Sequence, residues 1–371
     1  MMLQRTNRLR ALALGAVAVS GALVLTACGS DTNTSKDAQK AAAKIKCEGK
    51  GKLLSSGSTA QKNAVDAWVK NYQTACKETQ INYKDIGSGG GVQEWLQGTT
   101  SFAGSDSALK PEEVTKSKKV CKSGQGINLP MVGGPVAISY NVPGVDDLVL
   151  DASTTAKIFD SKIKKWNDPA IKKLNPKAKL PSTDIQPFHR SDESGTTQNL
   201  GKYLGTAAKD DWKYPDEKSW PAKGGQSASG SAGIAQQVKQ TDGAIGYFEL
   251  SYASANNLDT VKLDTGASKP VEATTENASK AIEDAEVAGK GKDLALDLNY
   301  ATKTEGAYPL MLVTYEILCD KGNKKSSLDA TKSFLTYTAS KDGQGELSKL
   351  GYAPLPDKIA EKVRSTIPEL S

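Results

Sequence analysis

The sequence contains few of the side chains that build metal centres. Its only histidine is His189, and none of its five cysteines lies in a Cys-x-x-Cys pair. Structural zinc sites usually contain such closely spaced ligands, and two-metal hydrolases need a cluster of aspartate and histidine side chains. The sequence therefore argues against a metal site and a metal-dependent hydrolase, and we expect no cofactor.

Long apolar runs are also scarce, and the one extended run lies near the N-terminus. Residues 11–25 are apolar or small and follow three arginines, and Leu25-Thr26-Ala27-Cys28 is typical of a bacterial lipobox. The run is shorter than the ~20 residues that a membrane-spanning helix needs. We expect a secretory signal peptide over 1–27, and Cys28 as the lipidated residue of an exported protein held on the outer face of the cell membrane. Residues 28–44 are polar and small, which predicts a flexible, lipid-anchored tether.

A large excess of one charge is absent as well. The formal net charge is +6, or +3 without the three arginines of the signal peptide, and the lysine clusters lie among acids without interleaved aromatic residues. Such clusters are typical of solvated surface and do not indicate nucleic-acid binding. A mildly positive field would still help to gather anions.

In an exported chain, the four cysteines that remain after Cys28 suggest disulfides. Cys47, Cys76, Cys121 and Cys319 allow three pairings. We favour Cys47–Cys76, because both residues flank the first strand–helix unit, and this leaves Cys121–Cys319. The chain is long enough to bury two cores, so these disulfides would tie segments together without replacing a core.

Strand, turn and helix alternate from Lys52 onwards, which predicts an α/β fold with a parallel sheet and helices on both of its faces. We expect strands over 52–55, 81–86, 101–105, 184–189, 243–247 and 308–319, helices over 60–75 and 92–96, and amphipathic segments over 326–340 and 345–350. A β-rich run over 129–142 is interrupted by Gly133-Gly134-Pro135, and the stretch 223–233 has the composition of a loop. The extended segments 129–132 and 307–312 are candidates for hinge strands.

Four polar clusters follow predicted strands: Ser56-Gly57-Ser58-Thr59, Gly87-Ser88-Gly89-Gly90-Gly91, Phe102-Ala103-Gly104-Ser105-Asp106 and Arg190-Ser191-Asp192-Glu193-Ser194-Gly195-Thr196. In α/β sheets, ligands bind beyond the carboxyl ends of the strands. Free N–H groups at helix starts, serine and threonine hydroxyls and an arginine fork together suit a tetrahedral oxyanion. Each cluster alone is explained equally well as a helix cap or a tight turn, so the anion-site hypothesis depends on their combination.

Six segments occur in an order that resembles a known family: 86–92, Ser105-Asp106, 162–169, 190–196, 243–247 and 352–356. The family is that of the phosphate-binding proteins of bacterial phosphate ABC importers, and the resemblance extends from about Lys52 to the C-terminus. It implies a periplasmic-binding-protein-like fold of type II, in which two α/β domains joined by two hinge strands close on inorganic phosphate in the cleft between them. We place domain I at 45–131 and 308–371, and domain II at 132–307. The resemblance also implies a monomer that delivers phosphate to the membrane subunits of an ABC permease.

Carried over by position, the resemblance implies a phosphate site made of Ser58, Thr59, Ala60, Ser88, Asp106, Arg190, Ser194, Gly195 and Thr196. Ala60 would contribute its backbone N–H group, and Ser58 would be a near neighbour of the ligand. The chain departs from the family at Ala60, where an aromatic residue is common, and at Gly89, where serine is common. Neither departure removes a backbone donor, so we expect the site to persist.

Asp106 would distinguish phosphate from sulfate by a proton. Phosphate keeps at least one proton at neutral pH and can donate it to a carboxylate, whereas sulfate offers only lone pairs, a contact that is costly in a dry site. Arg190 would hold Asp106 ionised. Asp192 would either orient Arg190 or cap the helix that follows.

Two alternatives stay open at this point. One is a binding protein for another oxyanion, such as sulfate, molybdate or a phosphonate. The other is an exported phosphatase with the same anion site, in which His189 would be a general base and Ser194 a nucleophile. We favour a binding protein without enzymatic activity, because His189 is better explained as the end of a predicted strand and the sequence offers no other evident base to activate Ser194.

Overall fold

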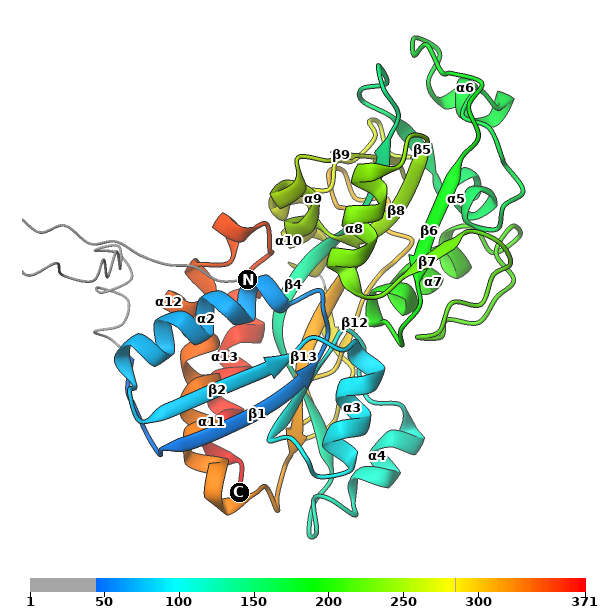
Figure 1. Cartoon of the computed structure of the whole chain (residues 1–371). Coiled ribbons are helices and arrows are strands. Elements are labelled where there is room, and N and C mark those ends of the chain that lie inside the picture. Colours follow the sequence, from blue (N-terminus) through cyan, green and yellow to red (C-terminus); the bar gives the residue numbers. More distant parts are fainter. Residues whose placement is uncertain (1–44, 284) are drawn as a thin grey trace, which may run out of the picture. The chain divides into compact units, whose positions relative to one another are not determined.

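The computed structural model describes residues 45–283 and 285–371, and all of them belong to one compact unit (Figure 1). The predicted signal peptide, the lipidated Cys28 and the tether lie outside the described residues. Among the helices that the structure describes, none is long and apolar enough to cross a membrane.

The chain alternates strands and helices as the pattern predicts. Its strands are β1 (Gly51–Gly57), β2 (Thr79–Lys84), β3 (Phe102–Ser105), β4 (Gly126–Asn141), β5 (Val149–Asp151), β6 (Gln186–Arg190), β7 (Gln226–Ala228), β8 (Ala244–Glu249), β9 (Asp259–Thr260), β10 (Lys262–Asp264), β11 (Glu286–Val287), β12 (Leu296–Asp297) and β13 (Met311–Cys319). Its helices are α2 (Lys62–Ala75), α3 (Ser88–Leu96), α4 (Pro111–Ser117), α5 (Ala152–Phe159), α6 (Pro169–Leu174), α7 (Gly195–Ala207), α8 (Gly230–Gln240), α9 (Leu250–Asn256), α10 (Thr275–Glu283), α11 (Lys325–Thr338), α12 (Lys341–Gly345) and α13 (Asp357–Thr366), with 3₁₀ turns at Ser348–Leu350 and Ile367–Glu369.

The principal sheet is mixed and not wholly parallel. Its strand order is β2-β1-β3-β13-β4-β8-β6-β7, and β9 pairs with β4 outside this path. Pairing is parallel at both ends, within β2-β1-β3 and within β8-β6-β7, but β13 and β4 run antiparallel to each other and to their outer neighbours. The prediction of a parallel sheet was therefore right for the two ends and wrong for the centre.

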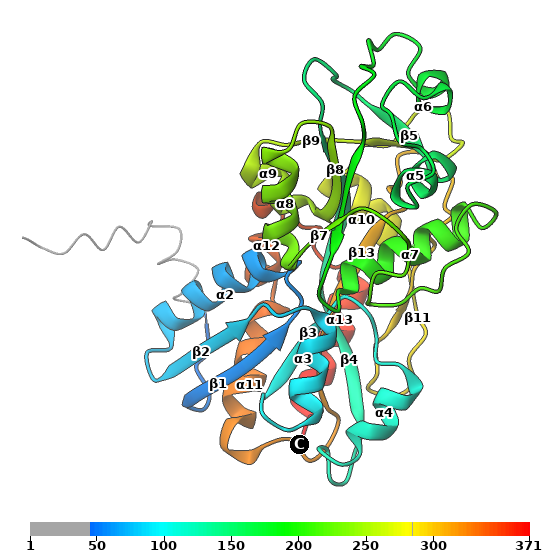
Figure 2. The ribbon, with the colours of Figure 1, turned by 45° about the vertical axis from the view of Figure 1, so that its right-hand side comes forward.

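Buried side chains gather in separate cores along this sheet, and we call the two regions around them the first and the second lobe. In the first lobe, Phe102 of β3 packs with α2, α11 and α13, while the next residue, Ala103, packs on the opposite face with α3 (Figure 2). The second lobe has its own core around β6, β8 and the C-terminal half of β4. The alternation of side chains along each strand lets helices cover both faces of the sheet.

The strands β4 and β13 contribute to both lobes. Leu129 of β4 packs in the first core and Ile138 in the second. The sequence pattern predicted an interruption at Gly133-Gly134-Pro135, but β4 continues through these residues because β13 pairs with all three of them. β4 includes the expected hinge segment 129–132, whereas only the last two residues of the other expected segment, 307–312, belong to β13.

The boundary between the lobes follows the packing of α10. Ala278 and Ile282 are buried in the same cluster of side chains as Val92 and Trp95 of α3, which belongs to the first lobe. The division into domain I (45–131 and 308–371) and domain II (132–307) stays a proposal, and the shared cluster favours placing α10 with domain I.

Both predicted disulfides are present. Cys47 is bonded to Cys76, which ends α2, and Cys121 is bonded to Cys319, the last residue of β13. The first disulfide joins the start of the described chain to α2, and the second joins the segment before β4 to its sheet partner.

Candidate functional site

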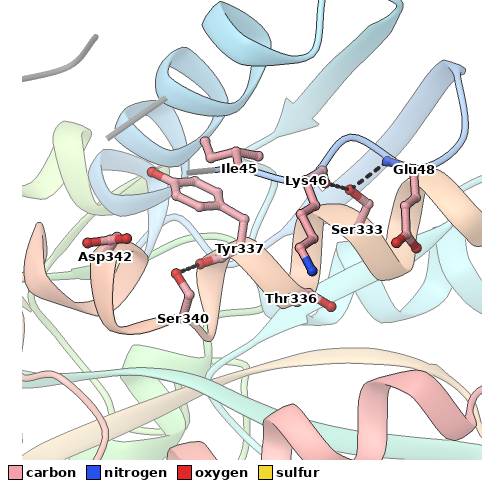
Figure 3. Close-up of a pocket in the computed structure, with 8 residues that line it drawn as sticks. All are labelled: Ile45, Lys46, Glu48, Ser333, Thr336, Tyr337, Ser340 and Asp342. Carbon is pink, nitrogen blue, oxygen red and sulfur yellow. Dashed lines mark hydrogen bonds between the residues drawn. The ribbon is translucent and has the colours of Figure 1, made fainter. Parts of the chain in front are cut away.

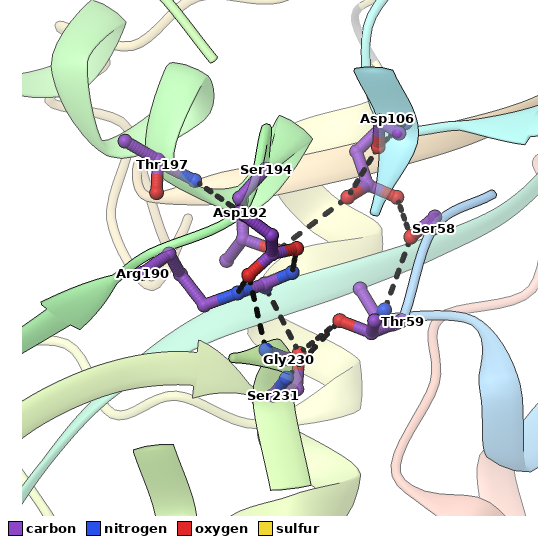
Figure 4. Close-up of polar contacts among 12 residues, drawn as sticks. Ser58, Thr59, Asp106, Arg190, Asp192, Ser194, Thr197, Gly230 and Ser231 are labelled. Atoms are coloured by element: carbon purple, nitrogen blue, oxygen red, sulfur yellow. Dashed lines mark hydrogen bonds and ion pairs between the residues drawn. The ribbon is translucent and has the colours of Figure 1, made fainter. Parts of the chain in front are cut away.

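The predicted anion-binding clusters converge where the two lobes meet. Ser58 and Thr59 follow β1, Asp106 follows β3, and Arg190 ends β6 (Figure 4). All four side chains are buried, with at most 3% of their surface exposed. The carboxyl ends of three strands thus meet at one place, as the position of ligands in α/β sheets requires.

Asp106 lies at the centre of a set of hydroxyl groups. Its Oδ1 accepts hydrogen bonds from Ser58 Oγ and from Thr314 Oγ1, the latter at 2.8 Å. Its Oδ2 has longer contacts, at 3.3 Å to Ser88 Oγ and at 3.4 Å to Thr196 Oγ1. Oδ1 is therefore fully engaged, whereas Oδ2 retains capacity for a stronger donor.

Burial raises the pKa of Asp106 above its ordinary value, against the opposing effects of hydrogen bonds from Ser58 and Thr314 and of the charge of Arg190. The sequence argument expected Arg190 to hold Asp106 ionised. The arginine acts in that direction, but without a ligand the cost of desolvating the carboxylate outweighs it. One reason is that Arg190 is already paired with another acid.

That acid is Asp192. Arg190 donates from Nε to Asp192 Oδ1 at 2.7 Å and from Nη2 to Oδ2 at 2.5 Å, and its Nη1 lies 3.4 Å from Ser231 Oγ. Burial would raise the pKa of Asp192, but the hydrogen bonds and charge of Arg190 bring it below its ordinary value. This two-point pair fixes the guanidinium plane and leaves N–H groups on its terminal nitrogens for a ligand.

The alternative that Asp192 caps α7 is wrong, because the N-cap residue is Ser194. Ser194 Oγ accepts from the N–H group of Thr197 at 3.1 Å, and Gly195 begins the helix. A Cβ atom on Gly195 would lie 2.5 Å from Ser88 Oγ and 2.6 Å from Asp106 Cβ. Only glycine therefore allows the start of α7 to approach the first lobe so closely.

The turn after β1 is held from several sides. Ser58 Oγ accepts from the N–H group of Ala60 at 3.0 Å, so this backbone donor, which we expected to face the ligand, already has a partner. The hydroxyls of Tyr252 and Tyr352 each donate at 2.6 Å, to the carbonyl oxygens of Thr59 and Ala60 respectively. Two tyrosines thus pack against the turn at which the chain lacks the aromatic residue common in the family.

The glycine cluster forms the first turn of a helix and not a loop. α3 begins at Ser88, and the N–H group of Gly89 donates to the carbonyl of Glu193 in the second lobe at 3.0 Å. A Cβ atom on Gly89 would lie only 2.1 Å from Glu193 Oε2. Glu193 therefore packs so closely against Gly89 that any side chain at this position would require the glutamate to move.

His189, the candidate base of the enzymatic alternative, is engaged elsewhere. Its ring stacks on Trp220, with centroids 4.9 Å apart and planes 7° from parallel, and its Nδ1 lies 3.1 Å from the carbonyl oxygen of Arg190. Burial lowers the pKa of this imidazole. These contacts are those of a packed structural residue.

Two residues of the site escaped the sequence argument. Thr314 lies within the apolar strand β13 and donates to Asp106, and Ser231 is the second residue of α8, in the stretch that we expected to be a loop. A polar residue inside an otherwise apolar strand was the available signal for Thr314. For Ser231, the Gly/Ser-rich composition concealed the helix start.

A separate pocket of about 280 Å³ lies where the described chain begins (Figure 3). It is lined by Ile45, Tyr337 and neighbouring residues, and Ser333 Oγ ties this segment to α11 by accepting from Glu48 N at 3.1 Å and donating to Lys46 O at 2.7 Å. None of the predicted site residues lines this pocket, so it is not the anion site.

Comparison with known proteins agrees with the geometry. The family model described as PBP superfamily domain matches residues 33–342. Phosphate-binding protein PstS 3 of Mycobacterium leprae is 41% identical over 357 residues, which cover 95% of this chain and 96% of the relative. The chain belongs to the PstS family of phosphate-binding proteins. Other members are PstS 2 of Mycobacterium tuberculosis, 40% identical with 95% and 96% covered, and PstS of Xylella fastidiosa, 33% identical with 81% and 80% covered.

Solved structures support the fold of this PstS-family chain. The phosphate-binding protein PfluDING superposes with a TM-score of 0.70 at 19% identity, covering 85% of this chain and 93% of that one. The phosphate-binding protein of Stenotrophomonas maltophilia superposes with a TM-score of 0.67 at 17% identity and the same coverage. The fold is thus the mixed α/β periplasmic-binding-protein-like fold of type II.

Proposed function

We propose that this protein binds inorganic phosphate with the site between its lobes and delivers it to an ABC-type phosphate permease. The observation that carries the proposal is the meeting of a buried acid, Asp106, with a buried, oriented arginine, Arg190, beside the starts of α3 and α7. Such a site offers donors to the oxygens of an anion and one acceptor for a proton of that anion. Family membership supports phosphate as the anion.

The two carboxylate oxygens of Asp106 differ in their hydrogen bonds, and we assign the selectivity to one of them. Oδ2, with its two long contacts, is the oxygen that would accept the phosphate proton. Sulfate would place a lone pair against the same atom, and that contact costs several kcal/mol in a dry site. The proposed filter is thus a single carboxylate oxygen held in place through its partner, Oδ1.

We propose that the described conformation is the closed one and that it opens by bending of β4 and β13. Contacts across the site join the lobes: Asp106 with Thr196, Gly89 with Glu193, and Ser107 Oγ with Gln198 Oε1 at 2.6 Å. A phosphate ion could enter only after these contacts separate, as in other hinged binding proteins.

The remaining features of the proposal concern location and partners. The predicted signal peptide and Cys28 support an extracytoplasmic protein anchored to the membrane by lipid, and the family resemblance favours a monomer. The packed ring of His189 and the capping role of Ser194 favour binding over phosphatase chemistry. Incubation with a phosphomonoester tests that choice, because turnover dependent on Ser194 would contradict it.

Isothermal calorimetry on the mature chain, with phosphate and sulfate as titrants, tests the function. We expect phosphate to bind and sulfate to bind at least about a hundredfold more weakly, since several kcal/mol separate the two contacts. Equal affinities would refute the proton filter, and binding of neither anion would refute the proposed function.

A further inference from the structure

The start of α8 lies at the candidate site, although its sequence is that of a loop. The N–H group of Gly230 donates to Asp192 Oδ1 at 3.0 Å, and that of Ser231 donates to Thr59 Oγ1 at 3.1 Å. The first two N–H groups of this helix therefore form hydrogen bonds to residues of different lobes. Asp192 orients Arg190 in the second lobe, and Thr59 belongs to the first.

The side chain of Ser231 makes the same connection. It is fully buried, and its Oγ lies 2.9 Å from Thr59 Oγ1 and 3.4 Å from Arg190 Nη1 (Figure 4). Thr59 Oγ1 accepts from a backbone N–H group, and Ser231 Oγ accepts from the arginine. The two hydroxyls can share one hydrogen bond, after which the hydrogen of one of them stays available to an acceptor.

We propose that Ser231 is a positioning residue of the phosphate site, which holds Thr59 and Arg190 so that donors from both lobes converge on one oxyanion. The inference rests on the proposed function and adds a residue that lies outside the set implied by the family resemblance. Because Ser231 and Thr59 belong to different lobes, their contact exists only in the closed form. Its hydroxyl therefore stabilises the closed complex and slows the release of phosphate.

The variant S231A removes the hydroxyl and keeps the backbone donor. We expect the Kd for phosphate to rise about ten- to a hundred-and-fiftyfold, the range for a hydrogen bond to a charged group. Most of the change should appear in the release rate measured by stopped-flow fluorescence. The matched control is S229A, because Ser229 is exposed, lies at the same helix start and makes no side-chain cap. Its Kd should match that of the parent.

A double-mutant cycle with T59A tests whether Ser231 acts by positioning Thr59 or contacts phosphate independently of it. If Ser231 acts through Thr59, the double variant T59A/S231A should bind phosphate little more weakly than T59A. Fully additive losses would overturn the inference. The melting temperature of S231A without phosphate should stay close to that of the parent, and a large fall would assign Ser231 a purely structural role instead.

These outcomes are distinct from failure of the proposed function. A parent protein that does not bind phosphate would refute that function itself. A parent that binds phosphate while S231A binds it as tightly and releases it as slowly would refute only the role of Ser231.

Discussion

At the scale of single residues, the proposed discrimination between phosphate and sulfate depends on Asp106. In D106N the amide can turn its NH₂ group towards the ligand, so a donor replaces the lone pairs that repel sulfate. We expect sulfate affinity to rise about tenfold or more, and phosphate binding to weaken by about 1–3 kcal/mol through loss of the proton acceptor. Calorimetry with both anions measures this. If sulfate binds D106N no better than the parent, the proton filter is wrong.

Glu316 gives the protein a dependence of stability on pH. Burial raises its pKa from 4.5 to about 8, with Asp106 adding in the same direction and a hydrogen bond from Gln61 opposing. The folded protein holds this proton more tightly than the unfolded chain, so the stabilisation is complete below about pH 4.5 and is lost as the pH rises to about 8. Buried Glu249, whose pKa burial also raises, acts with the same sign.

The variant E316Q should therefore flatten the pH profile of the melting temperature. We expect the parent to lose roughly 2–8 °C between about pH 5 and pH 8, and E316Q to lose clearly less, because glutamine stays neutral. E361Q, at an exposed position of α13, is the control and should follow the parent. Identical profiles for E316Q and the parent would show that Glu316 does not titrate in this range.

At this scale, the sequence predicted those residues of the candidate site that lie together in short motifs. Arg190, Asp192 and Ser194 stand within five positions of one another, and the structure brings them together with Asp106. Ser231 is different, because its role depends on a contact 172 positions away in the sequence, with Thr59. No local pattern encodes such a contact.

At the scale of elements, the sequence pattern predicted the longer strands of the principal sheet and the helices α2, α3 and α11, and failed where tertiary contacts override composition. The glycines at the start of α3 would favour a loop in isolation. They are helical here because the turn is held in place, with Gly89 bonded to Glu193 and Gly91 packed against Gly57. The same holds for α8, whose first two N–H groups find partners in distant segments.

The antiparallel centre of the sheet was not predictable from alternation of strands and helices. That alternation implies parallel neighbours within a lobe, and β1, β2 and β3 obey it. The order changes at β4 and β13, because each strand contributes side chains to both cores and the two pair with each other in opposite directions. The direction of β13 relative to β4 depends on where the C-terminal part of the chain comes back to the sheet, and local sequence patterns do not encode this.

At the scale of the whole molecule, ion pairs outside the candidate site also join the two lobes. Lys218 of the second lobe lies 3.4 Å from Glu113 of α4, and Lys110 lies 2.5 Å from Glu217. The Lys218–Glu113 pair is the more buried, with side-chain exposures of 9% and 18%. The carbonyl of Lys218 also accepts from the N–H group of Ser194 at 2.9 Å, which links this pair to the N-cap of α7.

Reversing one charge of this pair should therefore weaken phosphate binding from outside the site. We expect K218E to raise the Kd for phosphate about three- to tenfold, and E113K/K218E to recover most of the loss, because the partly buried pair regains opposite charges. K110A removes the more exposed pair and serves as the control, with an expected change below about twofold. Calorimetry at low and high salt measures all three. A double variant as weak as K218E would show that this ion pair does not contribute to phosphate binding.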